Sequence, residues 1–175
     1  MRIVPFFAVA VLSLATLACN DDPLKSSLPE TPPPPTTGVQ AFVQVDNTTA
    51  HPGDQIHVFV RVQFGTETAA KLGSYTGRLT FDPSVLAYQG EAKINDGLRV
   101  TNPSGAGQGD LRFAGAAADG FANLTLYEAV FEVKKADYLD ALKVSMEELS
   151  AAGTLADLRK TLVQPTQVFF RKTGQ

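Results

Sequence analysis

The side chains that could act as acids, bases, nucleophiles or metal ligands are few and scattered along this sequence. There are two histidines, His51 and His57, and one cysteine, Cys19. His51 lies among turn-forming residues, and His57 lies on the outward side of a predicted strand. Neither histidine has a cysteine or carboxylate at the spacing of zinc ligands. We therefore expect no catalytic residue, no metal site and no cofactor.

The acidic residues and one glycine-rich segment also fall in predicted turns. The aspartates near turns do not follow the spacing of an EF-hand loop; they are Asp46, Asp54, Asp82, Asp96 and Asp119. The segment GAGQGD, 105–110, resembles a phosphate-binding loop, but no lysine follows it and it joins predicted strands. The net charge is −3 and no basic block is present, which argues against a nucleic-acid partner. The sequence predicts a protein that is not an enzyme.

The cysteine stands directly after an apolar segment. Residues 3–18 are almost entirely apolar, and only Arg2 carries a charge before them. The segment is short for a membrane-spanning helix and is typical of a secretory signal peptide, 1–18. Small Ala18 before Cys19 resembles the lipobox of bacterial lipoproteins, although Thr16 replaces the usual aliphatic residue.

This resemblance implies cleavage before Cys19 and a diacylglyceryl group on its thiol. It places the protein at the bacterial cell envelope, on the periplasmic or cell-surface side, with the lipid as its only membrane contact. The alternative is an ordinary signal peptide followed by a chance cysteine. In either case an exported chain with one cysteine forms no internal disulfide.

Residues 19–38 are rich in proline and lack a hydrophobic period. Six of the eleven prolines lie between Asp21 and Gly38. Such a segment buries no core and is predicted to be a disordered tether. In polyproline II form it would span about 50 Å.

The rest of the chain, 39–175, has the size of one domain and the pattern of β-strands. In 55–63, Ile56, Val58, Val60 and Val62 alternate with polar or exposed positions. The same alternation predicts strands at 39–45, 74–81, 110–117, 124–134 and 166–172. The inward residues are Ala41, Val43 and Val45; Tyr75, Gly77, Leu79 and Phe81; Tyr127, Ala129, Phe131 and Val133; and Val168 and Phe170. Short strands separated by glycine, proline and asparagine turns predict an all-β sandwich.

One region, 137–162, has an ambiguous period. Leu139, Leu142, Met146 and Leu149 have helical spacing, whereas Leu142, Val144 and Met146 also alternate. The pattern by itself favours a helix.

Four segments together resemble the cohesin domain: HPGDQIHVFVRV, GRLTFDPSVLAYQG, DLRFAGAAADG and YEAVFEVKK. The FDPSVL step is the most specific, because Pro83 ends the strand, Asp82 suits the turn and Leu86 returns to the core. The resemblance implies a nine-stranded jelly-roll β-sandwich. It also implies that 141–149 is a strand and 154–162 a loop or short helix.

The resemblance implies a protein partner, because cohesins bind dockerin modules through the outward face of one sheet. The candidate residues are Ser74, Thr76, Arg78, Thr80, Arg112, Glu128 and Glu132. Dockerin-binding members typically carry an amide and a carboxylate where Ser74 and Thr76 stand, so the partner can differ while the fold is kept. Two alternatives remain open: binding of a polysaccharide, which the absence of tryptophan makes less favourable, and a purely scaffolding role.

The strand phases also predict three phenylalanines on the outer side of the other sheet. With their neighbours inward, Phe42, Phe59 and Phe169 point outward on adjacent strands. They either pack on one another or form an exposed aromatic contact patch.

Overall fold

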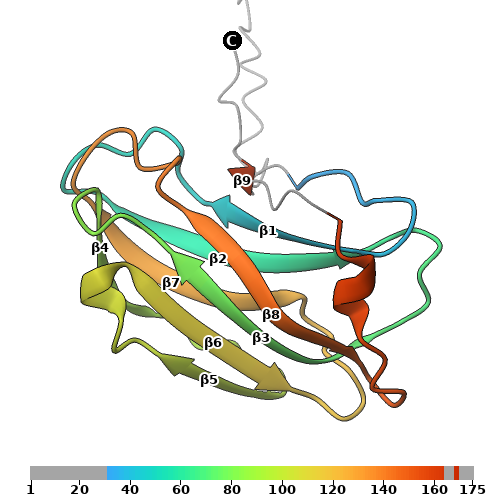
Figure 1. The fold of residues 1–175 in the computed structure, drawn as a ribbon. Coiled ribbons are helices and arrows are strands. Elements are labelled where there is room, and N and C mark those ends of the chain that lie inside the picture. Colours follow the sequence, from blue (N-terminus) through green and yellow to red (C-terminus); the bar gives the residue numbers. More distant parts are fainter. Residues whose placement is uncertain (1–30, 164–167, 170–175) are drawn as a thin grey trace, which may run out of the picture.

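Two facing β-sheets make up the domain in the computed structural model, which describes residues 31–163 and 168–169 (Figure 1). The five-stranded sheet has the order β4 (Leu86–Glu91), β7 (Thr125–Val133), β2 (Gln55–Phe64), β1 (Val39–Val45) and β9 (Val168–Phe169). The four-stranded sheet has the order β5 (Leu98–Asn102), β6 (Asp110–Ala116), β3 (Leu72–Thr80) and β8 (Lys143–Ala151). Two short 3-10 helices, η1 (Ala106–Gln108) and η2 (Leu158–Thr161), lie in connections. No described helix is long and apolar enough to cross a membrane.

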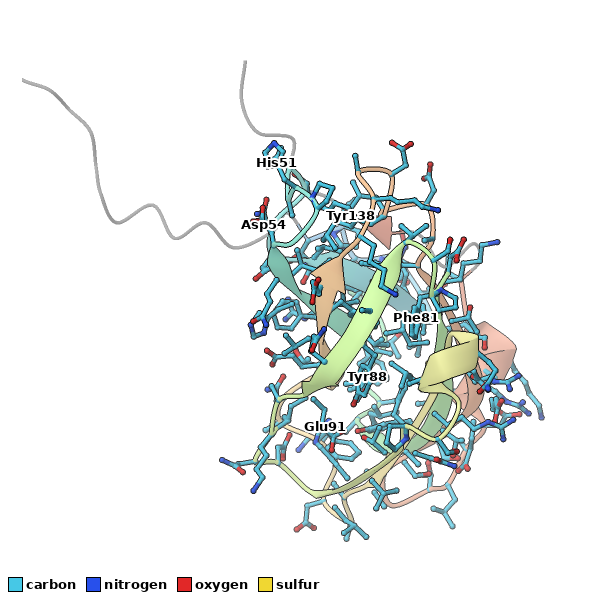
Figure 2. The ribbon with its side chains drawn as sticks, turned by 90° about the vertical axis from the view of Figure 1, so that its left-hand side faces the viewer. His51, Asp54, Phe81, Tyr88, Glu91 and Tyr138 are labelled. Carbon is cyan, nitrogen blue, oxygen red and sulfur yellow. The ribbon has the colours of Figure 1, made fainter. Side chains whose placement is uncertain are left out.

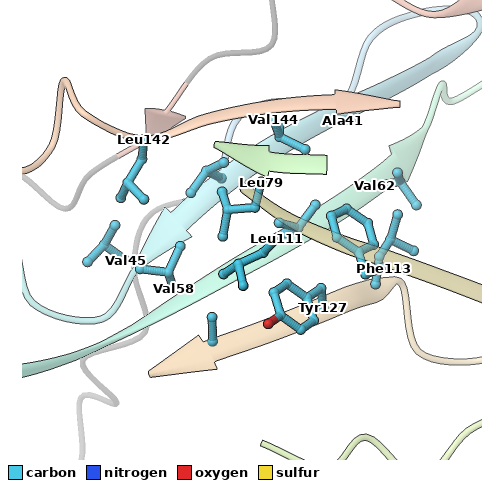
Figure 3. Packing of buried hydrophobic residues seen from close by; sticks show 14 of the residues in the cluster. Ala41, Val45, Val58, Val62, Leu79, Leu111, Phe113, Tyr127, Leu142 and Val144 are labelled. Atoms are coloured by element: carbon cyan, nitrogen blue, oxygen red, sulfur yellow. The ribbon is translucent and has the colours of Figure 1, made fainter. Parts of the chain in front are cut away.

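The period-two pattern correctly predicts which side chains enter the core. Ile56, Val58 and Val60 of β2 are fully buried, as are Val43 and Val45 of β1. Aromatic and aliphatic residues of the four-stranded sheet pack against these side chains between the two layers (Figure 3). The ring of Phe113 stacks on that of Tyr127, with the ring centres 5.2 Å apart. The predicted inward positions of β3 and β7 are confirmed in the same way. The side chains of Val168 and Phe170 lie outside the described residues.

The FDPSVL segment is a turn that returns Leu86 to the core, as predicted. The backbone amide of Ser84 donates to the Asp82 carboxylate at 2.7 Å, and the amide of Leu86 donates to the Asp82 carbonyl at 3.0 Å. Leu86 has no exposed surface. Asp82 thus has a local structural role, because its side chain satisfies a backbone donor that the turn leaves unpaired.

The region of ambiguous period contains a strand, so the helix that its pattern favours is wrong and the strand that the resemblance implies is right. β8 pairs with β3, with Val144 opposite Leu79, Met146 opposite Gly77 and Leu149 opposite Tyr75. A register shift beside Gly77 adds one residue to β8 between Met146 and Leu149. Because of this β-bulge, Met146 and Leu149 both point inward although they are three residues apart, and a spacing of three is also typical of one face of a helix.

The described residues that precede β1 also contact the domain. Residues 31–38, here called the strap, pack beside β2 and the loop that follows it. The Gln63 side chain donates to the carbonyl of Pro32 at 3.1 Å, and Pro32 is buried. The sequence predicts a disordered tether as far as residue 38, but the strap is bonded to the domain. Proline has no N–H to donate, yet its carbonyl still accepts hydrogen bonds, so a proline-rich segment can be held in this way.

Candidate functional site

The outer side of the four-stranded sheet carries most of the residues predicted to meet a partner. Ser74, Thr76, Arg78 and Thr80 all project from β3, which lies between β6 and β8. Each is partly exposed, while the residues between them are buried. Arg112 lies directly opposite Arg78 on β6 and shares this surface. We call this surface the β3 face.

Glu128 and Glu132 do not belong to the β3 face, and their assignment to it is wrong. Both lie on β7, which pairs with β2 and β4 in the other sheet. Glu128 contacts Nδ1 of His57 at 2.8 Å, and Glu132 accepts a hydrogen bond from Gln89 at 3.1 Å. Alternation along β7 shows that these side chains point outward, but the sheet to which β7 belongs depends on its pairing partners.

One end of the β3 face is charged. Arg78 donates to both carboxylate oxygens of Asp110, at 3.0 Å from Nε and 2.7 Å from Nη2. Arg112 lies 3.7 Å from the carboxylate of Asp110. Glu147 lies 3.8 Å from the guanidinium of Arg78. The hydrogen bond and charge of Asp110 raise the pKa of Arg78 above its ordinary value. The guanidinium is thus held in a fixed position on the surface.

The other end of the β3 face is apolar, which sequence analysis did not predict. Leu98 and Val100 of β5 are 69% and 58% exposed. They lie opposite Ala116 and Ala114 of β6. The small alanine side chains do not cover Leu98 and Val100. A shallow hollow of about 150 Å³ lies here, lined in part by Val100, Ala114 and Thr76.

The segment LRVTN, which forms β5, is not among the predicted strands, and its alternation gives no sign of which side faces the core. Arg99, and not Leu98 or Val100, points between the sheets. Its Nη1 donates to the hydroxyl of Tyr75 and to the carbonyl of Thr125, both at 2.8 Å. The guanidinium also lies 4.6 Å from the centre of the Phe121 ring. Because Arg99 satisfies buried carbonyls, β5 places its two apolar side chains in solvent.

Of the two alternatives for the outer phenylalanines, an exposed aromatic patch does not include Phe42. Phe42 lies on the outer side of β1 as predicted, but it is only 1% exposed. Phe59 is half-buried, lies opposite Gln44 and stacks on His57 with ring centres 6.2 Å apart. The Phe169 side chain lies outside the described residues.

The remaining candidates lie apart from both outer faces or outside the described residues. His51 and Asp54 lie at one end of the sandwich, near Tyr138, whereas Glu91 lies toward the other end (Figure 2). Within residues 31–163 and 168–169, no three histidine, cysteine or acidic side chains gather in a way that could hold a metal ion. Cys19 lies outside the described residues.

Comparisons with known proteins agree with this architecture. A family model described as the cohesin domain matches residues 41–166. The sixth cohesin of scaffoldin B from Acetivibrio cellulolyticus superposes with a TM-score of 0.53 at 13% identity, covering 75% of this chain and 99% of that one. A cohesin module of a family 33 glycoside hydrolase from Clostridium perfringens gives a TM-score of 0.54 at 12% identity, covering 77% and 98%. The OlpA cohesin of Clostridium thermocellum gives 0.52 at 13% identity, covering 75% and 95%. No curated protein matches.

Proposed function

This chain belongs to the cohesin domain family, and we propose that it is a non-catalytic binding module whose β3 face docks a dockerin-type protein partner. The structures of the scaffoldin B and OlpA cohesins are of complexes with dockerins. The observation that carries the proposal here is the composition of the β3 face. Exposed Leu98 and Val100 lie at one end of this face and a hydrogen-bonded cluster of charges lies at the other, which is the combination of apolar contact and polar orientation typical of protein interfaces.

Ser74 and Thr76 stand where dockerin-binding members typically have an amide and a carboxylate. A carboxylate is nevertheless available beside them from the neighbouring strand. Glu148 of β8 is the register partner of Thr76, and its Oε1 accepts a hydrogen bond from the Ser74 hydroxyl at 2.9 Å. We therefore place Glu148 among the residues that meet the partner, with Ser74 orienting it.

Two matched substitutions of exposed leucines test the proposal. Leu98→Asp places a charge in the apolar end of the β3 face, whereas Leu155→Asp changes a leucine that is 77% exposed in the loop after β8. Binding to a panel of recombinant dockerin modules is measured by titration calorimetry. We expect at least one dockerin to bind, with about a hundredfold loss for Leu98→Asp, the scale of an interface hot spot, and no loss for Leu155→Asp. Equal affinities of the two variants, or no binding by any dockerin, would contradict the proposal.

We infer the location of the module from the N-terminal sequence. Cys19 after an apolar segment supports a lipid anchor, and the residues between Cys19 and the strap support a spacer between membrane and domain. In this arrangement the protein displays its β3 face from the bacterial envelope toward a soluble partner.

A further inference from the structure

The strap lies against side-chain amides of the five-stranded sheet. Nε2 of Gln63 donates to the carbonyl oxygens of Pro32 and Pro33 at 3.1 and 3.2 Å. Nε2 of Gln44 donates to the hydroxyl of Thr31 at 3.1 Å. Gln44 is 1% exposed, so this amide lies in a closed contact and not on an open surface.

The loop after β2 binds the second half of the strap through its backbone. The amide of Thr66 donates to the carbonyl of Pro35, and the amide of Glu67 donates to that of Thr36, both at 3.1 Å. The amide of Gly65 donates to the carbonyl of Gly38 at 2.8 Å. Five carbonyls of the strap, those of Pro32, Pro33, Pro35, Thr36 and Gly38, therefore accept hydrogen bonds from β2 or the loop after it.

The direction of these hydrogen bonds suits a proline-rich segment. Prolines 32 to 35 have no N–H, so they lie against a protein surface without leaving a backbone donor unpaired. The surface supplies only donors to their carbonyls, from Gln63 and from Thr66. The restricted polyproline backbone also loses little conformational entropy when it is held.

Gly65 shows how closely the strap approaches. A Cβ atom built on Gly65 would lie 2.7 Å from the backbone of Thr37 and 2.8 Å from the carbonyl oxygen of Thr36. Gly65 is not among the residues with positive φ, so its own backbone does not require glycine. The absence of a side chain at this position is explained by the strap alone.

We propose that the outer side of β1 and β2 is a polyproline-binding surface, which the strap of this same chain fills in cis. This contact covers the outer side of the five-stranded sheet at Gln44 and Gln63. Because Thr31 lies against Gln44 on the outer side of β1, the described chain enters the domain on the side opposite the β3 face. The orientation of the β3 face as a binding surface rests on the proposed function, whereas the contact between the strap and the five-stranded sheet does not.

Hydrogen exchange of the full chain, followed by NMR, tests the cis contact. The reporters are the amides of Thr66 and Glu67, whose acceptors belong to the strap. Gly65→Ala introduces a methyl group against the strap, whereas Gly107→Ala introduces the same group where nothing lies within 4 Å. We expect protection of both reporters in the wild type and about tenfold or greater loss of protection in Gly65→Ala only.

Amides of β3 and β6 serve as the folding control and keep their protection in both variants. Unprotected Thr66 and Glu67 amides in the wild type, or equal exchange in the two variants, would overturn the cis contact. No partner is present in this experiment, so its outcome is independent of dockerin binding.

A nitroxide attached to Cys19, the only cysteine, in protein expressed without the signal peptide so that the thiol carries no lipid, tests the direction of the attachment. We expect the label to broaden amide signals of β1 and β2 more than those of β3 and β6, and the difference to shrink in Gly65→Ala. Equal broadening on both sheets of the wild type would overturn the directed attachment while leaving the hydrogen-exchange result intact.

Discussion

Arg78 and Asp110 are joined across neighbouring strands by two hydrogen bonds, of 3.0 and 2.7 Å. Asp110 also lies 3.7 Å from Arg112, the register partner of Arg78. One carboxylate thus holds two arginines that would otherwise face each other as like charges. The pair orients charge on the β3 face in advance of any partner.

Asp110→Asn should weaken binding of a protein partner by about tenfold, because both arginines lose the charge that fixes them. The unfolding temperature should change little, since the pair is partly exposed to solvent. Calorimetric titration with a dockerin that binds the wild type measures the effect. Asp119→Asn, in an exposed loop, is the control and should bind as the wild type does. An Asp110→Asn variant with wild-type affinity would remove this pair from the interface.

Leu86→Ala should lower the free energy of unfolding by about 2–5 kcal/mol, because it opens a cavity at a fully buried position. Chemical denaturation followed by circular dichroism gives the value. Leu155→Ala, at a leucine that is 77% exposed, should change it by about 0.5 kcal/mol or less. Similar values for the two variants would mean that the FDPSVL turn does not anchor the core.

Tyr138→Phe should cost about 1–3 kcal/mol of stability, since it leaves the buried amide of Ala50 and the carbonyl of Asn47 without their partner. The Tyr138 hydroxyl donates to the carbonyl of Asn47 at 2.6 Å and accepts from the amide of Ala50 at 3.3 Å. Tyr88→Phe is the control, because its hydroxyl makes only a 3.4 Å contact with that of Tyr127. Equal losses in thermal denaturation would show that the hydroxyl of Tyr138 has no special role.

Stability should fall in acid partly through Asp82. Hydrogen bonds from the backbone and side chain of Ser84 hold the pKa of Asp82 below its ordinary value of 3.8. The folded state therefore binds this proton less readily than the unfolded state, and the contribution is present above pH 3.8 and lost as pH falls below it.

Denaturation of Asp82→Asn at a series of pH values checks this expectation. The variant should lose less stability than the wild type on acidification, because asparagine accepts the same hydrogen bond without titrating. Asp157, whose pKa is lowered by the backbone amide of Arg159, should cause part of the remaining acid loss. Identical pH profiles for Asp82→Asn and the wild type would contradict the assignment.

Cys19→Ser should move the protein from the detergent phase to the aqueous phase in a phase-partition assay, because it removes the thiol that we propose carries the lipid. The assay uses protein expressed in a bacterium with its N-terminal segment intact. Ser13→Ala, within the apolar segment, should partition as the wild type does. Membrane retention of Cys19→Ser would rule out the lipid anchor.

The sequence by itself determined the local features of the domain. Branched residues alternating with polar ones fixed the inward side of β2, and Asp82 with Pro83 located a turn that delivers Leu86 to the core. These features depend on the period of an extended chain and on the chemistry of adjacent residues, both of which are visible in a short segment. The four quoted segments also carried the resemblance to the family that the comparison confirms.

Only the tertiary structure decided how these segments meet. The pairing of β7 with β2 separated Glu128 from Arg78, and the bulge in β8 gave a strand the spacing of a helix. The contact between Gln63 and Pro32 joins residues 31 positions apart, and the inward side of β5 is set by Arg99 reaching Thr125. Alternation fixes which side chains share a face of one strand, but the neighbouring strand, the register and the covering segment depend on contacts between residues far apart in the chain.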